Sequence, residues 1–224
     1  MMLLGDVRAE VASVCGRMAA SGLVVGTSGN VSARSGDLVA VSPSGLDYAD
    51  LTAELVGVHR LDGSAVAAPL APTSEMPLHL AVYTATGAGA IVHTHSPAAT
   101  AASVLLDEVP AVHYQVAAFG GPVAVAPYAT FGTGGLAANV VAALHGRTAC
   151  LMANHGAVAI GPDWAPPTAA RSTWNGCATC TCGRPRPAPR GCCPPRRSTW
   201  WRGSSPATAS GHQDGSRENR DGRR

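Results

Sequence analysis

The stretch "AIVHTHSP", residues 90–97, places two histidines one residue apart at the end of a short apolar run. The run predicts a β-strand at residues 90–94. Because side chains at positions i and i+2 of a strand point to the same face, His93 and His95 present neighbouring imidazoles, while Thr94 points away. The pair has a chelating geometry, although a half-buried strand that binds no metal can carry the same spacing.

A third imidazole and a carboxylate are candidates for the same site. His155, in "LMANHGAVAIGP", follows another apolar run and precedes Gly156, which lets the backbone turn sharply. Three neutral histidines and an open position are typical of a catalytic divalent site, most readily zinc. Glu75, in "PTSEMPLH", lies at a predicted helix start, where it could bind metal or transfer protons, or act as an ordinary cap. Nothing in the sequence pairs the remaining candidates, so we expect structural or surface roles for His59, His79, His113 and His145.

Composition limits both the class of protein and its chemistry. The chain has 224 residues, of which 46% are hydrophobic, so it can form one large domain or two small ones around a real core. It contains no lysine, and its sixteen basic residues are all arginine. A mechanism that needs a Schiff base with a protein amine is therefore excluded.

Periodicity predicts helices and strands that alternate through the first three quarters of the chain. Helices are expected at residues 6–20, from Thr73 or Ser74 as the cap to about 86, at 97–106 and at 135–144. Strands are expected at residues 31–34, 38–42, 55–61, 90–94, 123–125, 150–153 and 157–160. This order predicts a single α/β or α+β domain whose helices cover one sheet.

Seven motifs in order carry a resemblance to a known family. They are "GTSGNVS", "SPSG", "PTSEMPLHLAVY", "AIVHTHSPAAT", "AVHYQVAAFGG", "VAPYATFGT" and "LMANHGAVAIG". From about residue 6 to residue 163 the chain resembles the zinc-dependent class II sugar-phosphate aldolases, a family that includes L-fuculose-phosphate aldolase and, as a close relative, L-ribulose-5-phosphate 4-epimerase. The resemblance implies the class II aldolase fold, an α/β domain of three layers with helices on both sides of the sheet.

The resemblance also implies roles for individual residues. The metal ligands would be His93, His95 and His155, and Glu75 would be the general acid/base and a further ligand. Zinc is expected on ligand type, with manganese, cobalt or magnesium as alternatives. The resemblance also implies a homotetramer with sites between subunits, and Tyr114 would assist at the aldehyde oxygen across a subunit boundary. The phosphate-binding residues would be Thr27, Ser28, Gly29, Asn30, Ser44, Gly45, Thr73 and Ser74, whose amides and hydroxyls can satisfy a dianion without lysine.

The activity implied is the reversible retro-aldol cleavage of a ketose phosphate similar to L-fuculose 1-phosphate. The metal would act as a Lewis acid at the carbonyl, and Glu75 would move the proton at the adjacent carbon. The products would be an aldehyde and dihydroxyacetone phosphate. Alternatives within the family are a sugar-phosphate 4-epimerase, a dehydratase, a decarboxylase, or a non-catalytic domain like that of adducin.

Composition changes abruptly near Asp163. Residues 1–163 hold five arginines and eleven acidic residues, whereas residues 164–224 hold eleven arginines, three acidic residues and all four tryptophans. We therefore divide the chain into a family-like domain, 1–163, incomplete at its C-terminal end, and a tail, 164–224, expected to be disordered. Arginine, proline, glycine, cysteine and tryptophan are the residues that GC-rich codons give when they are read out of frame. A frameshift is therefore one hypothesis for the tail. Resequencing the gene at the codon for Asp163 tests it.

The sequence of the tail disfavours two other interpretations. A zinc or cluster site is disfavoured because the cysteine spacing does not form two C-x2-C pairs; the cysteines are Cys177, Cys180, Cys182, Cys192 and Cys193. A nucleic-acid-binding tail is disfavoured because the arginines alternate with prolines and form no face. The start of the chain has no basic leader, and nowhere do 18 apolar residues follow one another, which predicts a cytoplasmic protein without membrane contact.

Overall fold

The computed structural model describes residues 2–162, which form one sheet with helices around it. The helices are α1 (Gly5–Ala20), α2 (Met76–Ala85), α3 (Pro97–Leu105), α4 (Gly134–Ala143) and a 3-10 helix, η1 (Tyr114–Phe119). The strands are β1 (Asn30–Ser35), β2 (Leu38–Val41), β3 (Gly57–Arg60), β4 (Ala65–Ala67), β5 (Ala90–Thr94), β6 (Glu108–Val109), β7 (Val123–Ala126), β8 (Ala149–Met152) and β9 (Gly156–Gly161). The predicted tail, 164–224, with its frameshift and cysteine-site interpretations, lies outside the described residues.

The sheet has nine strands in the order β4-β3-β2-β1-β5-β9-β8-β7-β6. Neighbouring strands pair antiparallel, except for β7 and β8, which are parallel. The central strand β5 lies between β1 and β9, with His93 opposite both Asn30 and Val158. The C-terminal end of β5 therefore meets the N-terminal ends of its two neighbours, and residues at these ends are brought together.

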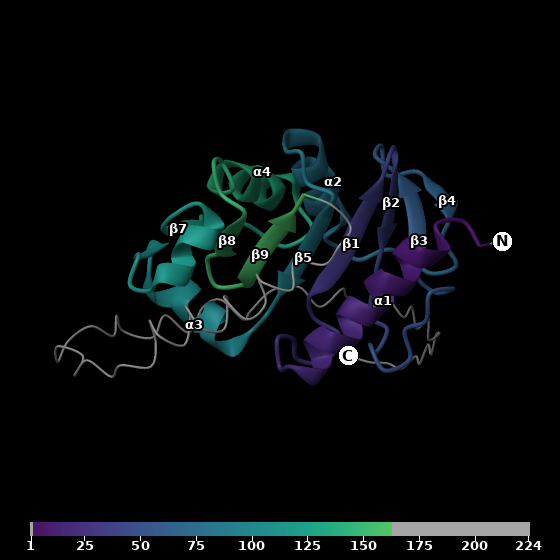
Figure 1. Ribbon diagram of the computed structural model, residues 1–224, viewed down its shortest axis with the longest axis horizontal. Coiled ribbons are helices and arrows are strands. Elements are labelled where there is room, and N and C mark those ends of the chain that lie inside the picture. The colour runs from purple at the N-terminus through teal and green to yellow at the C-terminus, as the bar shows by residue number, and fades with distance from the viewer. Residues whose placement is uncertain (1, 163–224) are drawn as a thin grey trace, which may run out of the picture. The chain divides into compact units, whose positions relative to one another are not determined.

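Helices cover both faces of the sheet (Figure 1). Side chains of β2 alternate between the faces, because Val39 and Val41 pack with α2 and α4, whereas Ala40 packs with α1. On β8, Leu151 packs with α3 on the face opposite to α2 and α4. The structure thus confirms the predicted α/β class and its three layers.

The start of α2 corrects one expectation. The N-cap is Glu75, whose side chain makes no capping hydrogen bond, in place of the predicted cap by Thr73 or Ser74; the Thr73 hydroxyl accepts from the Glu75 amide at 3.3 Å. The Glu75 carboxylate is bonded elsewhere, and the Met76 amide donates to the Thr73 carbonyl. In contrast, Ser96 and Thr133 cap α3 and α4 with their side chains.

Three short elements were not predicted: β4, β6 and η1. Strands β4 and β6 have only three and two residues, too few for an alternating pattern, and η1 is a 3-10 helix too short to show an α-helical period. Among residues 2–162, no helix combines the length and the apolar character that crossing a bilayer requires.

Gly156, the first residue of β9, tests how closely β5 and β9 must approach. A Cβ atom at this position would clash with the Thr94 carbonyl oxygen, because the two atoms would be much closer than a normal van der Waals contact. We expect Gly156→Ala to lower the free energy of unfolding by about 1–3 kcal/mol, as overpacking does, seen as a lower urea midpoint at constant m-value. Gly16→Ala is the control: its added methyl meets nothing within 4 Å in α1, so the helix should be unchanged or slightly more stable. Equal midpoints for the two variants contradict the prediction.

Candidate metal centre

Four side chains converge at the end of the central strands. One ligand atom each from Glu75, His93, His95 and His155 lies within 4.8 Å of the other three. His93 is in β5 and His95 follows that strand, while His155 directly precedes β9 and Glu75 caps α2. The structure therefore brings together all four residues that the sequence proposed for a metal site.

The local backbone explains how His155 reaches the other histidines. Asn154 adopts a left-handed conformation with φ of 58°, which turns the chain between β8 and β9. The His155 amide donates to the Met152 carbonyl at 3.1 Å and closes this turn. The absence of a side chain at Gly156 then lets β9 begin beside Thr94, so the three imidazole centroids lie 4.6–5.0 Å apart.

The partners of the two His93 ring nitrogens show that the centre suits a cation. The Nδ1 atom of His93 lies 3.0 Å from the Ala157 carbonyl, which only accepts, so Nδ1 carries the hydrogen. In the neutral ring, Nε2 then has a lone pair, yet it lies 2.8 Å from Nε2 of His95 and 2.9 Å from Oε2 of Glu75. Crowded lone pairs repel one another unless a proton or a metal ion lies between them. A backbone carbonyl that accepts from the other ring nitrogen and so fixes the tautomer is also typical of ligating histidines.

The second Glu75 oxygen, Oε1, provides an independent observation. It is buried, has no hydrogen-bond partner among the described residues, and lies 3.6 Å from Nε2 of His155. A buried oxygen without a donor is costly, and a cation would satisfy it. The donor set of imidazole nitrogens and one carboxylate therefore fits a divalent metal such as zinc.

The pKa values favour the metal-binding protonation states. Burial, together with the neighbouring His93 and His155 rings, lowers the pKa of His95 to about 4. Burial also lowers the pKa of His155. For Glu75, burial acts to raise the pKa, but the adjacent His93 ring and the hydrogen bond from Asn30 outweigh it and leave the pKa well below its usual value. Near neutral pH, His95 and His155 are therefore neutral and Glu75 is ionised, as ligands must be.

The three predicted phosphate loops are joined at the base of the site. Asn30 donates to Oγ1 of Thr73 at 3.0 Å and to Oε2 of Glu75 at 2.9 Å, linking the first loop to the third. The second loop pairs with the third through a bridge between Pro43 and Pro72. Both amide hydrogens of Asn30 are thus used inside the protein, and its part in phosphate binding stays a prediction.

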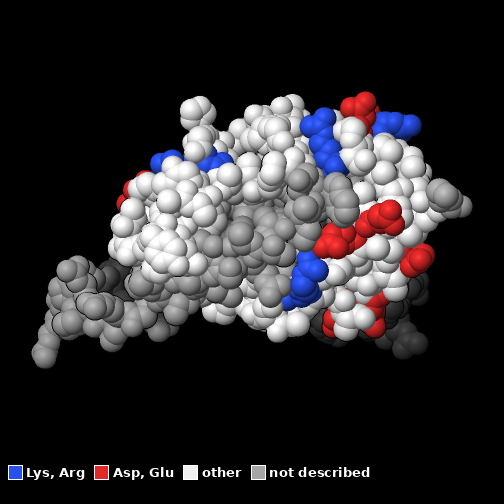
Figure 2. Space-filling view, viewed as in Figure 1, with Lys and Arg blue, Asp and Glu red and all other residues white. Residues whose placement is uncertain are grey.

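The remaining phosphate-loop residues offer neutral groups at the surface. Thr27, Ser44, Gly45 and Ser74 are exposed, and Ser28 and Gly29 are half-buried. The described arginines donate elsewhere, for example Arg34 to the Gly36 carbonyl and Arg8 to the Ala53 carbonyl. On the one face that Figure 2 draws, the charged side chains that can be seen lie in separate small groups. Any phosphate in these loops would therefore be held by hydroxyls and backbone amides.

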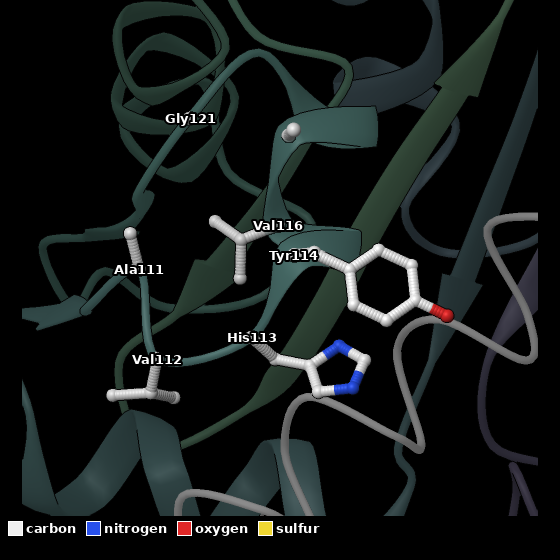
Figure 3. Close-up of a pocket in the computed structure, with 7 residues that line it drawn as sticks. Ala111, Val112, His113, Tyr114, Val116 and Gly121 are labelled. Atoms are coloured by element: carbon white, nitrogen blue, oxygen red, sulfur yellow. The ribbon is translucent and has the colours of Figure 1, made fainter.

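Tyr114 lies apart from the four converging side chains. It begins η1, is 81% exposed and borders a cavity of about 300 Å³ whose lining includes none of them. In Figure 3 its ring extends outward beside His113, with the hydroxyl directed away from Val116. A role at the reacting centre would require a second copy of the chain and stays a prediction.

Sequence reasoning missed the surroundings of His79. The residue was expected to have a structural or surface role; it is fully buried, and both ring nitrogens are bonded, Nδ1 to Ser32 and Nε2 to Asn30. The available signal was spacing, because His79 follows Glu75 by four residues and so lies one turn further along α2. His59, also buried, is far along the sheet in β3.

Comparison with known proteins places this geometry in a family. The sequence model of the "Class II Aldolase and Adducin N-terminal domain" matches residues 9–173. The chain belongs to this family. It is 43% identical over 161 residues to 5-deoxy-D-ribulose 1-phosphate aldolase of Bacillus thuringiensis serovar kurstaki, covering 70% of this chain and 76% of the relative. It is 40% identical over 152 residues to L-fuculose phosphate aldolase of Escherichia coli strain K12, covering 67% and 70%.

Solved structures agree with the sequence relatives. An L-fuculose 1-phosphate aldolase superposes with a TM-score of 0.76 at 34% identity, covering 81% of this chain and 87% of that one. The predicted family, fold and enzyme class are thereby confirmed. Class II aldolases are metal-dependent, and in this class II aldolase the histidine and glutamate group could hold the metal.

The buried neutral histidines predict a pH dependence of stability. Burial lowers the pKa of His79 to about 3, so the folded protein keeps this ring neutral while the unfolded chain takes up a proton below about pH 6.5. Stability of the metal-free protein should therefore fall as the pH drops from about 6.5 to 4.5, with His79 contributing up to about 1.4 kcal/mol per pH unit.

Urea unfolding at several pH values measures this slope. His79→Gln is the matched variant, because glutamine can replace the Nε2 donor but does not titrate. Its slope should be shallower than that of the unaltered chain. The same slope in both proteins would show that His79 does not remain neutral in the fold.

Proposed function

We propose that the chain is a metal-dependent lyase that cleaves a ketose 1-phosphate into an aldehyde and dihydroxyacetone phosphate, reversibly. The observation that carries the proposal is the convergence of Glu75, His93, His95 and His155 within 4.8 Å. Three imidazoles and one carboxylate would hold the metal, with zinc favoured on ligand type. When bound, the metal supplies Lewis acidity that stabilises negative charge developing on the carbonyl oxygen.

The chain's own residues would carry out the proton transfers. Cleavage breaks the C3–C4 bond of the ketose and leaves its electron pair on C3. The C4 hydroxyl gives up its proton as C4 becomes the aldehyde carbon, and C3 takes up a proton to complete dihydroxyacetone phosphate. Glu75 is proposed to move the proton at C3, since it is ionised and its Oε1 has no hydrogen-bond partner within residues 2–162.

The phosphate would lie in the three loops beside this centre. Thr27, Ser28, Gly29 and Asn30 belong to the first loop, Ser44 and Gly45 to the second, and Thr73 and Ser74 to the third. The exposed hydroxyls and amides of Thr27, Ser44, Gly45 and Ser74 supply neutral donors, and the buried Asn30–Thr73 bond keeps two of the loops together. Neutral donors of this kind can bind a phosphate dianion where no lysine is available.

The relatives suggest the substrate class. Their names specify 5-deoxyribulose 1-phosphate, 5-methylthioribulose 1-phosphate and L-fuculose phosphate. All are small phosphorylated ketoses, so we propose a substrate of this class. We also propose a homotetramer in which the partner's exposed Tyr114 assists at the aldehyde oxygen.

A panel of ketose 1-phosphates tests the proposal. Aldehyde release, followed by a coupled alcohol dehydrogenase, should require zinc or another divalent ion and should stop with chelator. Epimerisation or loss of water without aldehyde would favour the alternative chemistries of the family. Absence of every reaction in a metal-loaded chain would favour a non-catalytic domain.

His93→Ala should release the metal. This residue is fully buried and is held by the Ala157 carbonyl, so neighbouring side chains cannot replace its nitrogen. We expect metal content, measured by plasma emission spectroscopy after dialysis, to fall from one ion per chain to near zero. His145→Ala, outside the site, should keep the ion. Full occupancy in His93→Ala would count against the proposed ligands.

Glu75→Gln should separate metal binding from proton transfer. The three imidazoles remain, while the amide cannot take up a proton at working pH. We expect bound metal but a loss of about 100- to 10,000-fold in deuterium exchange at the C3 position of dihydroxyacetone phosphate, measured by proton NMR. Exchange at the original rate would remove Glu75 from its proposed role.

A further inference from the structure

We propose that His79, fixed by Ser32 and Tyr83, is a positioning residue that sets the orientation of the Asn30 amide and thereby aims the Glu75 carboxylate. The inference rests on the proposed role of Glu75. It concerns a buried row of hydrogen bonds behind the metal centre, built between β1 and α2. None of its members His79, Ser32 and Tyr83 belongs to the proposed ligand or phosphate-binding sets.

The direction of every bond in the row follows from the carboxylate. A carboxylate only accepts, so the Asn30 atom 2.9 Å from Oε2 of Glu75 is the amide nitrogen. The carbonyl oxygen of Asn30 then faces His79, which must donate to it from Nε2. A neutral ring with its hydrogen on Nε2 has a lone pair on Nδ1.

The outer half of the row continues in the same direction. The Ser32 hydroxyl lies 2.6 Å from Nδ1 of His79 and therefore donates to it. The Ser32 oxygen, having used its hydrogen, accepts from the Tyr83 hydroxyl at 2.7 Å. All four bonds therefore point toward Glu75, and the second amide hydrogen of Asn30 goes to Oγ1 of Thr73.

The row is suited to orientation and not to proton conduction. Ser32, His79 and Tyr83 are each at most 1% exposed, so the row ends inside the protein. Burial lowers the pKa of His79 to about 3, and burial raises the pKa of Tyr83 above its usual range. Both groups thus stay neutral near neutral pH, and the row acts as a chain of fixed dipoles.

The consequence for the reaction is a carboxylate with two different oxygens. Oε2 accepts from Asn30, whereas Oε1 has no hydrogen-bond partner among the described residues. If the Asn30 amide were reversed, its carbonyl oxygen would face Oε2 and repel it. His79 prevents the reversal because its Nε2 hydrogen requires an acceptor at that position.

The first experiment measures the tautomer directly in the full chain without metal. Long-range proton–nitrogen correlation spectra of the histidine rings should show His79 with its hydrogen on Nε2 between pH 6 and 8, with assignment from the spectrum of His79→Gln. A hydrogen on Nδ1, or a charged ring, would overturn the proposal. This result does not depend on activity.

The second experiment compares two replacements of His79 at equal metal content. Glutamine can place its amide nitrogen at the Nε2 position and should keep most of kcat. Asparagine reaches only the Nδ1 position, so it can bond Ser32 but not Asn30. We expect His79→Asn to lower kcat and the deuterium exchange at C3 by about 10- to 100-fold, as loss of an outer-shell partner does, with KM nearly unchanged.

Controls separate positioning from general loss of structure. His59→Gln changes another buried histidine, away from the row, and should leave kcat unchanged. Tyr83→Phe removes only the outermost donor and should have a smaller effect than His79→Asn. Equal kcat per bound metal in His79→Asn and His79→Gln would overturn the proposal. If the unaltered chain releases no aldehyde, the proposed function fails, while the tautomer spectrum still decides whether the row is directed as described.

Discussion

The metal centre depends on a fold that holds imidazole nitrogens and a carboxylate oxygen close together. Nε2 of His93 lies 2.8–2.9 Å from another imidazole nitrogen and from a carboxylate oxygen, an arrangement that is unfavourable without a cation. It can persist because each group is anchored from behind. His93 is fixed by the Ala157 carbonyl and Glu75 by the Asn30 amide, so the fold contributes the energy that brings the ligands together before metal binds.

Close backbone approach at the ends of β1, β5 and β9 makes this anchoring possible. Gly29, with φ of 75°, lies where a Cβ atom would be 2.8 Å from the His93 carbonyl oxygen. Gly156 occupies the matching place on the other side of β5, against the Thr94 carbonyl. Glycine is needed at both positions because any side chain would push the neighbouring strand away. The ligand geometry thus depends on two residues that carry no chemistry themselves.

Sequence predicted most of the elements and the inner residues of the site, for physical reasons that act locally. The alternation of side chains along a strand is a local property, so residues 90–94 and the shared face of His93 and His95 followed from "AIVHTH". Convergence of His155 and Glu75 came from family resemblance, since spacing alone does not show which strands are neighbours. The order of nine strands is a property of tertiary packing that no local pattern contains.

What the sequence did not reveal was decided by long-range pairing. The cap of α2 was placed on Thr73 or Ser74 because their hydroxyls are good caps, but the tertiary bonds of Glu75 fix a different helix start. The spacing of four residues from Glu75 puts His79 near the site, but it does not show what the His79 ring bonds. Its partners, Ser32 and Asn30, lie more than 40 residues away and meet it only when β1 packs against α2.

The packing of β1 against α2 buries polar side chains, which contributes little to stability. Asn30 and Ser32 alternate with Val31 and Ala33, so β1 presents an apolar face to α1 and a polar face to α2. Burying polar groups stabilises little even when every bond is made, and an apolar interface of the same shape could be equally stable. What a fully bonded polar row adds is a single allowed arrangement of its members. Between β1 and α2, that arrangement ends at the Glu75 carboxylate beside the three imidazoles. The proposed proton transfer depends on the orientation of this carboxylate.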